Sequence, residues 1–412
     1  MRKLRQLYKL LFWFLFTALA QAQNPSDQIA YLFRVSDGLK SPLRITMDAH
    51  DNVFVTDDVG SRVCRFDSTG RFLGEFTVGQ APLAIAVNKQ NRLIVSDRVQ
   101  SELLLLDVNG QLIKKMGQNV GPFGLLSSAI FDDDNRLYVV DSQQNCVHVF
   151  DERGQFVTSF GQEKLIYPTG IAFDKKNQRI LVAEHGGLFL SENLETVKMI
   201  HAFDKNGIWQ SGFGKYGHEL GKLSRVQGIT VDRWGRIYLA DIYQGLVTVL
   251  SEEGEFLAAI GKYGEQPGEM RAPMDLAIDS RGRLWVTAMN NGSIEIYDIG
   301  DFTTAVEPPA ESLLPSTSTL LQNFPNPFNP GTWLPFELKK DSQVIIHIYN
   351  QMGQRVRTFD LGKKSRGSYV TEGSAIFWDG ANDRGEIVAS GVYLYEIRLE
   401  ELVMVRRMLL LK

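Results

Sequence analysis

The chain has 412 residues, of which 44% are hydrophobic and 22% charged, so it is long and apolar enough to build one large and one small folded domain. It carries 48 acidic and 44 basic side chains, and this balance argues against a nucleic-acid partner, which would require a basic surface. Only two cysteines occur, Cys64 and Cys146, and a whole repeat lies between those that hold them, which favours buried thiols over a disulfide.

The first 22 residues have the three parts of a secretory signal peptide. Four basic residues among the first nine precede an apolar run from Leu10 to Ala20, and Ala20 and Ala22 frame a small-residue cleavage site. A membrane anchor is the alternative, but it needs about 20 apolar residues and this run has about half as many. We therefore expect export, cleavage after residue 22, and a mature chain with a net charge of about −8 and no transmembrane span.

Six copies of one pattern follow between Pro42 and Gly300. Each copy has an apolar strand, a tight turn, a second apolar strand, a third strand and a turn ending in glycine. The first turns are Asp51-Asn52, Gln90-Asn91, Asp134-Asn135, Asn177-Gln178, Trp234-Gly235 and Arg281-Gly282. Repeats of four short strands over roughly 40 to 57 residues are typical of β-propeller blades. The predicted fold class is all-β, with a six-bladed propeller over residues 23–300.

Two of the copies depart from the pattern. The sixth lacks a fourth strand, and the alternating segment 29–35 precedes the first copy without a partner of its own, so we expect this segment to complete blade six and close the ring. The fourth copy takes twenty residues instead of ten from Glu184 to Asp204, which predicts a ten-residue insertion from His185 to Leu194.

An acid ends the second strand in five copies: Asp57, Asp97, Asp141, Glu184 and Asp241. A calcium ring is one interpretation. A repeated acid more often accepts backbone N–H bonds in its own loop, however, whereas a functional site is asymmetric, so we expect these acids to be structural. Ala288 stands at the sixth position.

The inner strands supply the candidates for the channel. Equivalent positions near their starts hold Arg44, Ala84, Ser128, Gly170, Gly228 and Asp275, and the lining two positions later is small and mostly uncharged. Arg44 and Asp275 become neighbours when the ring closes. They either pair across the seam or hold a polar ligand together.

The loops between the second and third strands lie on the same face as the starts of the inner strands, and ligands bind at this mouth in propellers. His185 follows Glu184 there, and Arg98, Tyr243 and Asn290 occupy equivalent loops. They could recognise a peptide or a sugar by aromatic and polar contacts, or form a passive loop. The ligand-binding candidates are Arg44, Arg98, His185, Tyr243, Asp275 and Asn290.

Two segments resemble known ligand-binding motifs but lack residues that these motifs require. The run from Asp132 to Asp134 resembles half of a calcium loop but lacks the glycine and the distant glutamate, so a solvated hairpin is expected. The segment from Gly214 to Lys222 lacks the glycine spacing of a P-loop, and Leu223 replaces the hydroxyl residue. No catalytic residue, metal ligand or cofactor is assigned.

The repeats resemble NHL repeats. The resemblance rests on Pro168-Thr-Gly-Ile-Ala-Phe-Asp174, on Arg136-Leu-Tyr-Val-Val-Asp141, on Val147-His-Val-Phe-Asp151 and on the glycine-rich run from Phe213 to Gly221. It covers residues 29–300 and implies a six-bladed propeller. NHL propellers include protein-binding and RNA-binding modules, sensor domains and a peptide-processing lyase, so the resemblance leaves the function open.

A Pro/Ser/Thr-rich linker over 301–320 leads to a second domain, residues 321–412. Alternating strands at 344–348, 392–397 and 402–411, with glycine turns between them, predict a small β-sandwich. The segments Leu321-Gln-Asn-Phe-Pro-Asn-Pro-Phe-Asn-Pro330, Phe377-Trp-Asp-Gly380 and Ser390-Gly-Val-Tyr-Leu-Tyr395 resemble the C-terminal sorting domain of type IX secretion cargo, which is similar to the immunoglobulin-like domain of flagellar hook-capping proteins. The resemblance implies transport across the outer membrane by the type IX machinery. An adhesive Ig-like module is the alternative.

Together these features predict a secreted or cell-surface recognition module, not an enzyme, that binds a protein, peptide or glycan at the propeller mouth. The alternative is an extracellular lyase or hydrolase with a metal near His185 and Asp275. The expected location is the outer-membrane surface or the medium, after export through the periplasm.

Overall fold

The computed structural model describes residues 29–185, 197–300, 318–326, 328–370, 374–400 and 402–411. The expected signal peptide, the insertion beyond His185 and residues 301–317 of the expected linker lie outside these ranges. The chain divides into two compact units, Met1–Tyr216 with Leu220–Val306 and Gly217–Glu219 with Glu307–Lys412, which are described separately. In the described part of the chain, no helix is long and apolar enough to span a membrane.

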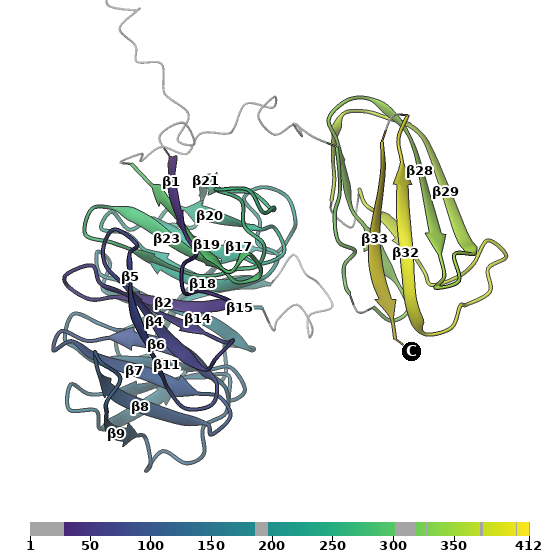
Figure 1. The fold of residues 1–412 in the computed structure, drawn as a ribbon. Coiled ribbons are helices and arrows are strands. Elements are labelled where there is room, and N and C mark those ends of the chain that lie inside the picture. The colour runs from purple at the N-terminus through teal and green to yellow at the C-terminus, as the bar shows by residue number, and fades with distance from the viewer. Residues whose placement is uncertain are drawn as a thin grey trace, which may run out of the picture. The chain divides into compact units, whose positions relative to one another are not determined.

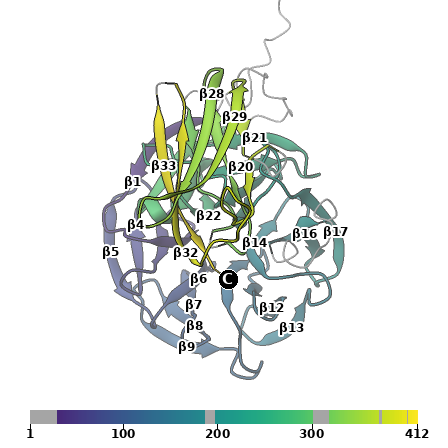
Figure 2. The ribbon, with the colours of Figure 1, turned by 90° about the vertical axis from the view of Figure 1, so that its right-hand side faces the viewer.

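The larger unit is a ring of six four-stranded antiparallel sheets around a central axis (Figure 2). Blade 1 contains β2 (Pro42–Met47), β3 (Val53–Asp57), β4 (Arg62–Phe66) and β5 (Phe72–Thr77). Blade 2 contains β6 (Pro82–Val87), β7 (Arg92–Asp97), β8 (Glu102–Asp107) and β9 (Leu112–Met116). Blade 3 contains β10 (Leu126–Phe131), β11 (Leu137–Asp141), β12 (Cys146–Phe150) and β13 (Phe156–Phe160). The first strand of each blade lines the axis.

Blade 4 contains β14 (Pro168–Asp174), β15 (Arg179–Glu184), β16 (Lys198–Asp204) and β17 (Trp209–Lys215). Blade 5 contains β18 (Val226–Val231), β19 (Ile237–Asp241), β20 (Leu246–Leu250) and β21 (Phe256–Ile260). Blade 6 contains β22 (Pro273–Ile278), β23 (Arg283–Ala288) and β24 (Ser293–Asp298), and its outer strand is β1 (Ala30–Val35). The N-terminal strand therefore occupies the outer position that the sixth repeat leaves empty.

The turn between the first and second strands of each blade contains a residue with positive φ. These residues are Asp51, Asn91, Asn135, Gln178, Gly235 and Gly282, with φ from 52° to 89°. Asparagine, aspartate and glycine tolerate this backbone region better than other residues, which is why they recur at the first turn. The repeat positions in the sequence thus correspond to the hairpins of the structure.

The core of the propeller lies between the blades. Six buried apolar clusters among the described residues each join two neighbouring blades, one cluster for every seam of the ring. The cluster between blades 6 and 1 includes Trp285, Phe66 and Val35, so the N-terminal strand also contributes to the core. Both cysteines are free and buried, as the separation of the repeats that hold them predicted.

The smaller unit is an immunoglobulin-like β-sandwich (Figure 1). One sheet has the order β29-β28-β32-β33, formed by β28 (Ser342–Tyr349), β29 (Arg355–Lys364), β32 (Gly391–Arg398) and β33 (Val403–Leu410). The opposing strands are β25 (Thr319–Leu320), β26 (Thr332–Leu334), β27 (Phe336–Leu338), β30 (Gly367–Tyr369) and β31 (Ile376–Trp378). Its own core is centred on Trp378, Phe328 and Tyr395.

Candidate functional site

The side chain of Arg44 closes the central channel. Arg44 lies on the inner strand of blade 1, is only 2% exposed, and extends across the axis toward the opposite blades. Its guanidinium donates hydrogen bonds to the carbonyl oxygens of Ser127 (2.9 Å), Thr169 (2.6 Å) and Gln227 (2.8 Å), which belong to blades 3, 4 and 5. The equivalent positions on these facing strands are the small residues Ser128, Gly170 and Gly228. Gly170 also lets the inner strands of blades 4 and 5 approach closely, since a Cβ added there would lie 2.7 Å from the Gln227 carbonyl oxygen.

Arg44 also pairs with Asp275 of blade 6. The Arg44 Nη1 atom lies 3.5 Å from the Asp275 carboxylate, whose other oxygen accepts the backbone N–H of Ile45 at 3.1 Å. Burial lowers the pKa of Arg44 and raises that of Asp275, and the attraction between the two charges opposes both shifts. The pairing that equivalent positions suggested is thus present, and both side chains are engaged within the protein.

Hydroxyl groups join most neighbouring inner strands around this hub. Thr56 accepts the backbone N–H of Arg44 and donates to the Leu83 carbonyl of blade 2. Equivalent bridges to the next blade are made by Ser96, Ser142, Thr169 and Thr287. At the seam between blades 5 and 6, Gly228 instead allows the backbones to touch, because a Cβ there would lie 2.6 Å from the Asp275 Cα. The polar groups around Arg44 are therefore hydrogen-bonded within the protein.

The acids that end the second strands are structural. Asp57 accepts the backbone N–H groups of Lys40 (2.7 Å), Ser41 (3.2 Å) and Val59 (3.1 Å). The equivalent residues Asp97, Asp141, Glu184 and Asp241 accept backbone N–H groups in the same way. In blade 6, where Ala288 replaces the acid, the Asn291 side chain accepts the N–H of Arg271 at 2.6 Å. These contacts fix the loop into each inner strand.

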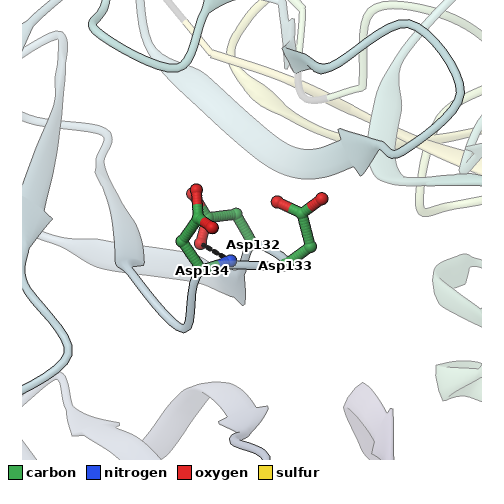
Figure 3. Close-up of side chains that lie close together, drawn as sticks. All are labelled: Asp132, Asp133 and Asp134. Atoms are coloured by element: carbon green, nitrogen blue, oxygen red, sulfur yellow. Dashed lines mark hydrogen bonds between the residues drawn. The ribbon is translucent and has the colours of Figure 1, made fainter.

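The acidic run in blade 3 places three carboxylates close together at the first hairpin (Figure 3). The carboxylates of Asp132, Asp133 and Asp134 lie within 4.8 Å of one another and are the one group of this kind among the described residues that could hold a metal ion. The ammonium of Lys205 lies 3.5 Å from Asp132, 2.7 Å from Asp133 and in contact with Asp134. Asp132 also accepts the N–H of Asp134 at 2.9 Å, as a hairpin residue does. Lys205 thus supplies one positive charge, which offsets part of the negative charge of the three carboxylates.

Two of the mouth candidates are engaged with neighbouring loops. Arg98 forms an ion pair with Asp58 of blade 1 at the protein surface. Asn290 lies in the short 3-10 turn η3 (Met289–Asn291), and its carbonyl oxygen accepts a hydrogen bond from Arg271 at 2.8 Å. Neither contact tests a role in ligand binding.

The other two candidates, His185 and Tyr243, are brought together by residues that the sequence patterns did not single out. Arg225 donates a hydrogen bond to the Tyr243 hydroxyl at 2.8 Å, and its guanidinium lies 5.3 Å from the centre of that ring. The Tyr167 ring lies 5.3 Å from the His185 ring. Burial, and secondarily the charge of Arg225, lower the pKa of His185 to about 4. We call Tyr167, His185, Arg225 and Tyr243 the mouth strip.

A comparison of the copies could have found the two missed residues. Tyr167 and Arg225 each stand immediately before an inner strand, in blades 4 and 5. The other blades have Ser41, Ala81, Leu125 and Ala272 at this position. A large polar residue at a site that is otherwise small or aliphatic is the asymmetry that a functional face requires. At neutral pH His185 is uncharged, so Arg225 alone gives the strip its charge.

Comparison with known proteins agrees with this architecture. The family model of the FlgD Ig-like domain matches residues 330–401. The chain is 28% identical over 156 residues to the Drosophila melanogaster protein brain tumor and 28% identical over 126 residues to the Caenorhabditis elegans B-box type zinc finger protein ncl-1. These regions are 37% and 29% of this chain but only 14% of each of those proteins.

Among solved structures, a gluconolactonase from Xanthomonas campestris is similar, with a TM-score of 0.50 and 19% sequence identity over 66% of this chain and 89% of that one. At this identity the likeness shows the fold alone. The chain is therefore an all-β protein with a propeller and a C-terminal Ig-like domain.

Proposed function

We propose that this protein is an exported recognition module whose propeller binds a protein, peptide or glycan on its mouth face. The observation that carries the proposal is the position of Arg44. Its buried guanidinium lies across the axis and donates its hydrogen bonds to backbone carbonyls, so Arg44 is already engaged within the protein. Recognition then falls to the mouth loops, where the Tyr167 and Tyr243 side chains are 40% and 53% exposed.

A binding test on the whole chain addresses the proposal directly. Peptide and glycan arrays are probed with the wild type, with Tyr243→Ala in the mouth strip, and with Arg71→Gln as a control. Arg71 lies in the β4–β5 turn on the opposite face and is mostly exposed. We expect capture of a ligand that Tyr243→Ala weakens and Arg71→Gln leaves intact. Absence of any captured peptide or glycan would reject the proposal.

Export is the second part of the proposal. It is supported by the signal-like first 22 residues, by the FlgD Ig-like match at residues 330–401 and by the resemblance of this domain to type IX sorting domains. The propeller, in this interpretation an NHL-type domain, is displayed on the outer-membrane surface or released. Residues 321–412 fused to a periplasmically targeted reporter should carry it outside a host with type IX machinery and leave it in the periplasm of a host without that machinery. A reporter retained in both hosts would contradict the sorting role.

An extracellular lyase or hydrolase is the second candidate, because the propeller fold is shared with a gluconolactonase. The required metal would lie near His185 and Asp275, but Asp275 is already paired with Arg44. Elemental analysis of protein purified without an affinity tag, together with a lactone hydrolysis assay, separates the two candidates. A stoichiometric metal with hydrolytic activity would favour the enzyme.

A further inference from the structure

We propose that the mouth strip is the binding site of an acidic peptide segment, whose carboxylate pairs with Arg225 while neighbouring side chains pack on Tyr167 and Tyr243. This inference rests on the proposed function and specifies its ligand. It depends on the charge and the exposed rings of the strip, and on exposed aliphatic side chains elsewhere on the mouth face, which are taken in turn below.

The guanidinium of Arg225 has no carboxylate within ion-pair distance among the described residues. Three other arginines at this end of the blades differ in this respect. Arg98 pairs with Asp58, Arg271 with Glu265, and Arg62 with Glu75. The Arg225 side chain is instead held by the hydrogen bond from its Nη1 atom to the Tyr243 hydroxyl. A planar guanidinium with unused donors is suited to bidentate pairing with a carboxylate.

The backbone of Arg225 holds this charge in place. Its N–H donates to the carboxylate of Asp241 at 3.2 Å, within the network that fixes the start of the inner strand of blade 5. His185 adds no competing charge at neutral pH, because burial lowers its pKa to about 4. The strip therefore presents one positive charge at a defined place. Because that charge is already held, the protein loses little conformational entropy when a ligand binds.

Two partly exposed tyrosine rings accompany the charge. Tyrosine and arginine are enriched among the residues that dominate protein interfaces, because they combine apolar area with hydrogen bonding. On the opposite side of the same mouth face, Val59 and Val99 are 48% and 59% exposed in the second-to-third strand loops of blades 1 and 2, so a chain that crosses the mouth from the strip would meet them. Exposed aliphatic side chains find apolar partners in a polypeptide, whereas a hydroxyl-rich sugar offers few. The mouth face as a whole thus favours a peptide over an acidic glycan.

The test uses the whole chain and a synthetic peptide array in which each Asp- or Glu-containing sequence has an Asn or Gln counterpart, beside an array of neutral and uronic-acid oligosaccharides. We expect the acidic peptides to bind about tenfold or more tightly than their amide counterparts, with affinity that falls as salt is added. Arg225→Gln should abolish this preference, Arg225→Lys should keep part of it, and Arg71→Gln should keep all of it.

Each remaining outcome decides against a defined claim. Peptides that bind without an acidic preference, a preference that survives Arg225→Gln, or binding of uronic-acid oligosaccharides alone would overturn the acidic-peptide inference and leave the recognition function standing. If the protein binds to neither the peptide array nor the oligosaccharide array, the recognition function itself is overturned. Tyr243→Phe removes only the hydroxyl that anchors Arg225, so a reduced preference in this variant tests the strip should Arg225→Gln not fold.

Discussion

Arg44 shows how one side chain changes the character of a propeller channel. Taking a guanidinium out of water is costly, and the cost is offset only when its donors are satisfied. Here carbonyl oxygens of blades 3, 4 and 5 and the carboxylate of Asp275 provide those partners. A single residue thus links blade 1 to four others, and the side chain that closes the channel also stabilises the ring.

Replacing Arg44 with methionine should lower the free energy of unfolding by about 3–5 kcal/mol, because Asp275 is then buried without its ion-pair partner and several carbonyl oxygens lose their donor. Urea denaturation of the purified variant measures this. In Arg44→Met/Asp275→Asn the loss should be smaller than the sum of the two single losses.

The control is Arg71→Met. The Arg71 side chain pairs with Asp67 and is 75% exposed, so its replacement should change the free energy of unfolding by less than about 0.5 kcal/mol. An Arg44→Met variant as stable as this control would contradict the role of Arg44 as the hub of the ring.

His185 predicts a pH dependence of stability. Its pKa in the folded protein is about 4, below the ordinary value of 6.5, so between these values the unfolded chain binds more protons. The contribution is therefore fully present above pH 6.5 and is lost as the pH falls toward 4, by up to about 3 kcal/mol. Unfolding free energies of the wild type and His185→Gln at pH 7 and pH 4.5 measure it. Equal losses in both proteins would show that His185 does not titrate in this window.

Sequence comparison between the copies could predict the pairing of Arg44 with Asp275, because the repeat aligns their positions and ring closure makes them neighbours. It could not predict the reach of Arg44 to blades 3 to 5. That reach depends on the combined smallness of the facing positions and on carbonyls whose directions only the assembled ring defines. Only two of the four residues of the mouth strip were predicted, for a related reason. His185 and Tyr243 lie in the loops between the second and third strands, where candidates were expected, whereas Tyr167 and Arg225 lie one residue before inner strands.

At the level of single elements, β1 determines whether the ring is closed. It pairs antiparallel with β24, with Val35 opposite Ile294 and Ala30 opposite Asp298, and the register shifts between Tyr31 and Phe33. After this irregularity Arg34 stands opposite Glu295, and the two side chains pair at 2.6 Å. The missing fourth strand made the partner of β1 predictable from the sequence. The register irregularity, and hence the ion pair, was not.

The ion pair of Arg34 and Glu295 fastens β1 to β24. The Glu295 side chain is fully buried, and it also accepts hydrogen bonds from the Ser293 hydroxyl (2.8 Å) and the Gly268 N–H (3.1 Å). Arg34 donates further bonds to the carbonyl oxygens of Glu265 and Gln266. Backbone pairing and a partly buried ion pair therefore hold the N-terminal strand against β24.

Glu295→Gln should weaken the interaction with Arg34 while preserving the shape of the side chain. We expect a loss of about 2–4 kcal/mol, because Arg34 loses its charged partner. Hydrogen exchange should become faster at the amides of β1 and β24 before it does so in blade 3, since the change is local to the closing blade. Uniform acceleration over all blades would instead mean that β1 opens only when the whole ring unfolds.

At the scale of the whole molecule, apolar burial is divided between two units. Among the described residues, each propeller cluster contains only residues of the propeller, and the sandwich cluster contains only residues from 320 to 410. Within the propeller every blade shares clusters with both neighbours, so the ring is expected to unfold as one cooperative system. The repeat period and the composition change after Gly300 were enough to predict this division from the sequence.

Matched tryptophan substitutions test the independence of the two cores. Trp285 belongs to the seam between blades 6 and 1, Trp378 belongs to the sandwich, and both are fully buried. Calorimetry of the whole chain should show two transitions. Trp285→Ala should lower only one of them and Trp378→Ala only the other, each corresponding to a loss of about 3–5 kcal/mol in its own unit. A single transition that both substitutions shift equally would mean that the propeller and the sandwich unfold as one cooperative unit.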